Sequence, residues 1–354
     1  MALELLKRLI ATPSHSREES ATATIIEEWL EERGVATVRR GNNVLAYSVG
    51  FDVEARPTLL LNSHHDTVRP AESYTRDPYS PDIEDGRLYG LGSNDAGASV
   101  VGLMSAFVAH YPTSDRLPFN TLLAITAEEE VMGEGGIRSL AKELECVDFA
   151  IVGEPTLLDA AIGERGLVVL DCVAAGKSGH AARNEGDNAL YRAIRDIEKL
   201  RTFTFPQRSA LLGDIRLTTT MIKCGTQHNV VPDKCHFVVD CRTTDAYTNQ
   251  EMVDLLAKEL ESTITPRSTR IGASALDESH PLLHAAKELG ATPYISPTTS
   301  DMALMSWASL KIGVGDSARS HTADEWVGVA EVEAGVEFYI NYIDKLAQIY
   351  ETME

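Results

Sequence analysis

Short, continuous apolar runs alternate with helical segments in the first half of the chain, and this pattern restricts the fold more than any other feature. The runs at 44–49, 58–61, 121–125 and 149–152 each have the length of a buried strand. Ser16-x-x-Glu19 predicts a capping box that opens a helix at Ser16. Strands that are apolar on both faces occur in sheets covered by helices on both sides. We therefore expect a three-layer α/β domain.

The order of elements changes at about residue 166. From there the patterns predict strand, helix, strand, strand, helix and strand, at 167–173, 188–200, 217–223, 236–242, 251–261 and 269–274. This is the ferredoxin-like order, with α+β composition. After about residue 275 the α/β pattern resumes. The sequence thus predicts one α/β domain, residues 1–165 and 276–354, interrupted by a smaller inserted domain, residues 166–275.

Charge and cysteine content exclude several kinds of partner and compartment. The 354 residues include 53 acidic and 32 basic side chains, for a net charge of −21. Nucleic acids and anionic membranes bind basic surfaces, so neither is expected as a partner. The 5 cysteines form no C-x-x-C pair, which favours free thiols in a reducing compartment. No signal peptide is visible, and the longest uncharged stretch, 96–108, is too short to span a bilayer. We expect a cytoplasmic protein.

The most informative motif lies where the apolar run 58–61 ends. His64 and Asp66 follow it two residues apart, so both side chains point to the same face of a strand. A carboxylate beside a metal-binding histidine fixes the tautomer of the ring. Taken alone, H-x-D also fits ordinary polar residues at a strand end.

Four further segments place acids or histidines where an apolar run ends. Asp95 stands among glycines before an apolar helix, where it could also be a simple N-cap. Residues 128–130 are three consecutive glutamates after the run 121–125, Glu154 follows the run 149–152, and His321 follows a later strand. Carboxylate oxygens and imidazole nitrogens suit zinc or cobalt. Three carboxylates and two histidines match a dinuclear site with one bridging carboxylate, and an adjacent glutamate could act as a base.

In this order, the five motifs resemble those of the co-catalytic zinc aminoacylase/carboxypeptidase family, which includes acetylornithine deacetylases and succinyl-diaminopimelate desuccinylases. The resemblance covers essentially the whole chain. It implies a zinc-peptidase-like catalytic domain that holds two Zn²⁺ ions, with Co²⁺ as an alternative. It also implies a ferredoxin-like lid that forms a homodimer, and a small N-acyl amino acid as substrate.

The resemblance assigns roles residue by residue. It implies five metal ligands, with Asp95 bridging: His64, Asp95, Glu130, Glu154 and His321. Asp66 would orient His64, and Glu129 would be the general base. The triple glutamate also permits a register one residue earlier, with Glu128 as base and Glu129 as ligand.

Three residues of the inserted domain match the family's substrate contacts. His180 lies in a G-x-x-G-H segment, which implies an oxyanion stabiliser supplied by the partner subunit. Asn229 and Arg242 match residues that bind the substrate's α-carboxylate. Thr299-Ser300-Asp301 resembles a turn that precedes the last metal histidine, without its usual glycines.

The predicted activity is removal of an N-acyl group from an amino acid. The segment from Gly315 to His321 and the short chain resemble the acetylornithine and acetyl-lysine deacetylase branch. An acetylornithine deacetylase, or an acyl-ornithine or acyl-citrulline deacylase of arginine biosynthesis, is therefore the first prediction. Acetyl-lysine deacetylase, succinyl-diaminopimelate desuccinylase and a dipeptidase or carboxypeptidase are the alternatives. An iron(II) facial triad would leave three of the acids without a role, and a non-catalytic binding protein would be expected to have lost ligands or the base.

Overall fold

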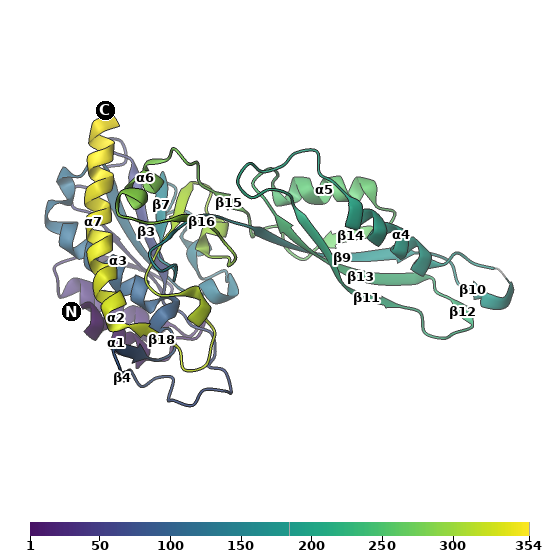
Figure 1. The fold of residues 1–354 in the computed structure, drawn as a ribbon, viewed down its shortest axis with the longest axis horizontal. Helices are drawn as coiled ribbons and strands as arrows, with labels where there is room; N and C mark the ends of the chain where they lie inside the picture. Colours follow the sequence, from purple (N-terminus) through teal and green to yellow (C-terminus); the bar gives the residue numbers. More distant parts are fainter. Residues whose placement is uncertain (184, 354) are drawn as a thin grey trace. The chain divides into compact units, whose positions relative to one another are not determined.

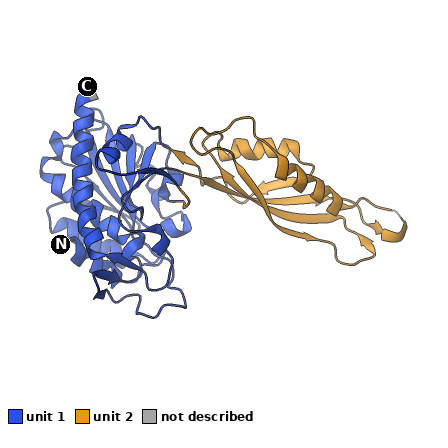
Figure 2. Ribbon diagram, viewed as in Figure 1, with its two compact units in different colours: residues 1–162, 276–295, 300–354 blue, residues 163–275, 296–299 orange. Residues whose placement is uncertain are grey.

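The structure is a computed structural model that describes residues 1–183 and 185–353. It divides into two compact units, shown in Figure 2. Unit 1 comprises residues 1–162, 276–295 and 300–354, and unit 2 comprises residues 163–275 and 296–299. The chain thus leaves unit 1 after residue 162 and returns at residue 276, and the short segment 296–299 also clusters with unit 2.

Unit 1 is built on a mixed sheet in the order β1-β2-β6-β3-β7-β17-β8. These strands are β1 (Thr37–Arg40), β2 (Asn43–Tyr47), β6 (Asn120–Thr126), β3 (Thr58–His64), β7 (Phe149–Val152), β17 (Ala308–Lys311) and β8 (Ala160–Glu164). β6, β3, β7 and β17 are mutually parallel neighbours, and every residue of β3, β6 and β7 is buried. β15 (Ser274–Ala275) and β16 (Pro293–Ser296) pair with β8. The predicted α/β class is confirmed.

Helices and short helical turns cover this sheet (Figure 1). The helices are α1 (Ala2–Ile10), α2 (Ser20–Glu31), α3 (Ala98–His110), α6 (Pro281–Glu288) and α7 (Val329–Met353). α1, α3 and α7 pack on one another, and α3 contacts β3 and β6. A separate core cluster, which includes Leu60 and Leu122, packs the sheet against residues 137–147 and 304–307. Among the described residues, no helix has the length and apolar character needed to cross a membrane.

Short turns carry the polar segments between these elements. They are η1 (Ser93–Gly97), η2 (Tyr111–Arg116), η3 (Glu129–Val131), η4 (Ile137–Leu140), η6 (Asp301–Leu304) and η7 (Ser317–Arg319). A small sheet in the order β18-β5-β4 completes unit 1, formed by β18 (Trp326–Gly328), β5 (Arg87–Tyr89) and β4 (Ile83–Glu84).

The predicted helix start at Ser16 is wrong, because α2 begins at Ser20 and no capping box forms. The Ser16 hydroxyl instead donates a hydrogen bond of 2.7 Å to the Asp66 carboxylate. Glu19 accepts from Asn42 Nδ2 at 2.8 Å, and its side chain is therefore also used in a contact distant in sequence. Tertiary hydrogen bonds have replaced the local cap.

Unit 2 has the ferredoxin-like element order. Its elements are β9 (Gly166–Ala175), α4 (Ala189–Thr202), β11 (Arg216–Cys224), β13 (Lys234–Thr243), α5 (Asn249–Glu259) and β14 (Thr263–Pro266). The strands form an antiparallel sheet in the order β11-β13-β9-β14, and residues of α4 and α5 share one apolar core with it. Beside it, β10 (Gly179–His180), the turn η5 (Ala181–Arg183) and β12 (Val230–Val231) form a small projection. The predicted last strand at 269–274 is wrong: β14 lies earlier and ends at Pro266, which has no N–H for the ladder.

Candidate metal centre

The carboxyl ends of the parallel strands meet at one edge of the unit 1 sheet, where α/β folds place their sites. His64 is the last residue of β3, residues 129–130 begin η3 after β6, and Glu154 follows β7. Asp95 lies in η1, directly before α3, and His321 follows η7. The five predicted metal ligands therefore come from five separate segments of unit 1.

The Asp95 carboxylate lies between two groups of these side chains. One of its oxygens is 3.2 Å from His64 Nε2, and the other is 3.6 Å from His321 Nε2. His64 Nε2 is also 3.6 Å from Glu154 Oε1, and His321 Nε2 is 2.8 Å from Glu130 Oε2. The arrangement gives two neighbouring ligand sets that share one carboxylate: His64 with Glu154, and His321 with Glu130.

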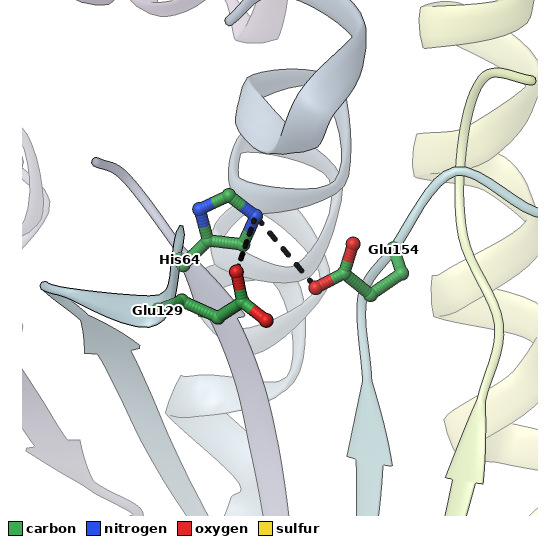
Figure 3. A group of neighbouring side chains, drawn as sticks. All are labelled: His64, Glu129 and Glu154. Atoms are coloured by element: carbon green, nitrogen blue, oxygen red, sulfur yellow. Dashed lines mark ion pairs between the residues drawn. The ribbon is translucent and has the colours of Figure 1, made fainter. Parts of the chain in front are cut away.

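Glu129 points into the same cluster. Its Oε2 is 3.9 Å from His64 Nε2, and Figure 3 shows the carboxyl groups of Glu129 and Glu154 both directed at the imidazole. One potential ligand atom each from His64, Glu129 and Glu154 lies within 4.8 Å of the other two, and the same holds for His64, Asp95 and Glu130. Such spacing suits a small cation bound among several side chains.

Glu128 points away from the cluster, although the sequence could not separate it from its neighbours. Its backbone is left-handed, with φ of 54°, and its Oε2 accepts a 3.3 Å hydrogen bond from the Gly135 N–H. A Cβ at Gly133 would clash with this carboxylate, so the close approach requires glycine there. The structure thus brings Glu129 and Glu130, and not Glu128, to the other ligands.

Asp66 connects two of the segments. Its carboxylate is 3.4 Å from His64 Nδ1 and accepts hydrogen bonds from the backbone N–H groups of Glu129 (3.0 Å) and Glu130 (3.2 Å). Burial alone would raise the pKa of Asp66, but its contacts with His64 and the Ser16 hydroxyl lower it. Asp66 therefore contacts both the His64 ring, whose Nδ1 also lies 3.0 Å from the Asp66 backbone carbonyl oxygen, and the turn that presents the two glutamates.

Glu325 holds the segment that carries Asp95, and sequence reasoning gave it no role. Its Oε1 accepts hydrogen bonds from the N–H groups of Asn94 (2.8 Å) and Asp95 (2.9 Å), and its Oε2 accepts one from Gly92 (3.1 Å). The residue is only 2% exposed. The only feature of the sequence that points to Glu325 is its position four residues after His321. Spacing alone does not predict a hydrogen bond to a segment 230 residues away.

The cluster concentrates buried acids. Burial raises the pKa of Glu154 to about 8, against the opposing effect of His64, and raises the pKa of Glu129 well above its usual range. Asp301, at the start of η6, is also buried, and it accepts a 2.8 Å hydrogen bond from the Thr126 hydroxyl. Bound divalent cations would compensate this charge, and the donor set of carboxylate oxygens and imidazole nitrogens fits zinc or cobalt.

The three remaining predicted residues lie in unit 2. His180 is opposite Val230 in the β10–β12 pair, and the Ala181 N–H donates a 3.1 Å hydrogen bond to the Asn229 carbonyl. His180 and Asn229 are therefore neighbours on the projection. Arg242 lies near the opposite end of β13, where its guanidinium binds Asp240 at 2.8 Å. Unit 2 thus does not bring Arg242 to the other two.

Together, the sheet, the position of the cluster and its ligand types define a metal-dependent hydrolase with an α/β fold. The profile of peptidase family M20/M25/M40 matches residues 60–345. The chain belongs to this family, which confirms the resemblance carried by the five motifs and its identification as a hydrolase.

Individual relatives agree with this assignment. A succinyl-diaminopimelate desuccinylase from Parvibaculum lavamentivorans is 27% identical over 384 residues, which covers 99% of this chain and 94% of that protein. The crystal structure of the aminopeptidase PepT from Bacillus cereus matches with a TM-score of 0.75 at 18% identity, covering 98% of each chain. A dinuclear metal-binding M20 peptidase from Bacillus subtilis matches with a TM-score of 0.71 at 15% identity, covering 99% of this chain and 98% of that one. At these identities the two structures show the shared fold.

Proposed function

We propose that this protein hydrolyses the amide bond of an N-acyl amino acid at a site that binds two zinc ions, or two cobalt ions. The observation that carries the proposal is the Asp95 carboxylate, with one oxygen 3.2 Å from His64 and the other 3.6 Å from His321. A carboxylate shared between two ligand sets suits a site for two neighbouring metal ions. His64 and Glu154 would hold one ion, and Glu130 and His321 the other.

The side chains around this site would have separate roles in the reaction. Bound cations supply Lewis-acid polarisation of the amide carbonyl and a water molecule that is easily deprotonated. Glu129 lies beside the set of His64 and Glu154, with its Oε2 3.9 Å from His64 Nε2, and its carboxylate would take the proton of the attacking water and pass it to the leaving amine. Asp66 keeps the His64 ring in one tautomer.

Succinyl-diaminopimelate is the first substrate to test. Relatives such as that from Parvibaculum lavamentivorans are named succinyl-diaminopimelate desuccinylases, and this favours the alternative drawn from the sequence over the acetylornithine prediction. The amine product would then belong to lysine biosynthesis. N-acetylornithine, N-acetylcitrulline, N-acetyl-lysine and a few dipeptides complete the panel, and the substrate with the highest kcat/KM identifies the acyl group and the amino acid.

A second copy of the chain would complete the substrate contacts. His180 and Asn229 lie beyond one end of β13, and Arg242 lies eight residues from that end, about 26 Å away at 3.3 Å per residue. An N-acyl amino acid is about as long as four extended residues, about 14 Å. One substrate cannot reach both places on the same unit 2, so we propose that Arg242 acts in one subunit and His180 with Asn229 in its partner.

The deciding experiment compares Glu129→Gln with Glu128→Gln. We expect Glu129→Gln to keep its bound metal, measured by elemental analysis, and to lose about 10²–10⁴-fold in kcat, because the general base is gone. Glu128→Gln is the matched control, since its side chain faces Gly133 and Gly135, and it should stay within a few-fold of the parent. The reverse result would shift the register by one residue. Loss of metal in Glu129→Gln would make Glu129 a ligand.

A further inference from the structure

Two of the cysteines face each other across neighbouring strands of unit 2. In the antiparallel pair β11–β13, Cys224 lies directly opposite Cys235. Directly opposed residues point to the same face of a sheet, with Cα atoms about 4.5–5.5 Å apart. Disulfide-linked cysteines have Cα atoms about 4.4–6.8 Å apart. A disulfide could therefore join this pair without a change of strand register.

The two thiols differ in their access to solvent. Cys235 is fully buried in the apolar core of unit 2, and Cys224 is partly buried against the same core. Cys224 also lines a cavity of about 520 Å³, together with Lys223 and Lys234. Burial raises the pKa of the Cys235 thiol to about 12. A small oxidant would therefore meet Cys224 first.

We propose that Cys224 and Cys235 form an oxidative modification site, which a hydroperoxide converts to a disulfide. In the first step the Cys224 thiolate attacks a peroxide oxygen. The O–O bond breaks, and Cys224 becomes a sulfenic acid as hydroxide leaves. The Cys235 sulfur then attacks Cys224 Sγ, so that the S–S bond forms and the S–O bond breaks. The Cys235 proton leaves with the oxygen as water, so two thiols and one hydrogen peroxide give one disulfide and two waters.

The position of the pair gives its oxidation a consequence for the proposed active site. The segment between the two cysteines, residues 225–234, contains Asn229 and β12, and β12 pairs with the strand that carries His180 (Figure 1). A disulfide would link the residues at the two ends of this segment and restrict its motion. The effect on turnover rests on the proposed function, because only there do Asn229 and His180 contact substrate.

Intact mass spectrometry of the full chain tests the site without an activity assay. Hydrogen peroxide should remove two hydrogens, about 2 Da, peptide mapping should find the link between residues 224 and 235, and dithiothreitol should reverse it. Cys224→Ser should abolish the link. Cys172→Ala is the matched control, because Cys172 is buried in the same core but lies opposite Phe237, and it should leave the link intact. Peroxide treatment that yields only sulfinic acid, or a link to another cysteine, overturns the proposal.

Hydrogen exchange and turnover then test the consequence. We expect the amides of residues 225–234 to exchange more slowly in the oxidised protein, and kcat/KM to fall and recover on reduction. An unchanged kcat/KM with the link fully formed would overturn the effect on the site. A protein that turns over no substrate in either state counts against the proposed function alone, because the mass and exchange measurements still decide the fate of the thiol pair.

Discussion

Removal of the Glu325 carboxylate should weaken metal binding without touching a proposed ligand. In Glu325→Ala, the N–H groups of Gly92, Asn94 and Asp95 lose their acceptor. Each lost hydrogen bond costs about 1 kcal/mol once water enters, so the free energy of unfolding should fall by about 3 kcal/mol. Because the Asp95 backbone is then free to move, zinc affinity should fall about 10–100-fold, as for other residues that orient metal ligands.

The assay is a competition titration of zinc against a chromophoric chelator, paired with urea unfolding. Asp196→Asn is the matched control. The Asp196 carboxylate is also buried and accepts from backbone N–H groups, those of Glu261 (3.1 Å) and Ser262 (2.8 Å), but it lies in unit 2. The Asp196→Asn variant should therefore lose stability and keep the zinc affinity of the parent. If Glu325→Ala loses stability while its zinc dissociation constant stays at the parent value, Glu325 does not set the geometry of Asp95.

Three further predictions concern the metal, pH and stability. Chelation with 1,10-phenanthroline should lower the melting temperature and abolish hydrolysis, because it leaves the buried carboxylates uncompensated, and added zinc should restore both. Burial lowers the pKa of His280 below its usual 6.5, so its contribution to stability is present above pH 6.5 and is lost as pH falls, when the unfolded chain takes up the proton first. His280→Asn keeps an acceptor for the Leu282 N–H. Urea titrations should therefore show that the free energy of unfolding falls less between pH 7.5 and pH 5 in this variant than in the parent. Arg319 binds Glu331 through two nitrogens and stacks on Trp326. Arg319→Lys should lower the free energy of unfolding in urea by about 1–2 kcal/mol. This loss should exceed that of Arg87→Lys, whose guanidinium also lies over that ring.

Most strands of unit 1 could be predicted from the sequence, because strands that are buried on both faces consist of continuous apolar runs. The strand predicted at 149–152 has those bounds in β7, and the run 121–125 lies inside β6. In a parallel sheet the residues after such runs meet at one edge. The convergence of His64, Glu154 and the acids after β6 therefore follows from local pattern alone.

Two local signals failed for the same physical reason. Ser16 carries a capping motif, but its hydroxyl gains more from the buried Asp66 carboxylate than from an exposed helix end. The last strand of unit 2 is set by pairing with β9, from Thr263 to Pro266, and not by its own alternation. Propensity decides such segments only where no distant partner competes.

The sequence by itself determined the class of fold, the order of elements in both units and the residue types that meet at the sheet edge, because these depend on periodicity and on where strands end. Only the tertiary structure decided which of three identical glutamates face the ligands. The left-handed backbone at Glu128, and the hydrogen bonds that the N–H groups of the next two residues donate to the Asp66 carboxylate, make that choice. The tertiary structure also decided that Glu325 supports Asp95. A hydrogen bond between segments 230 residues apart depends on how the chain packs, and the local sequence pattern does not predict it.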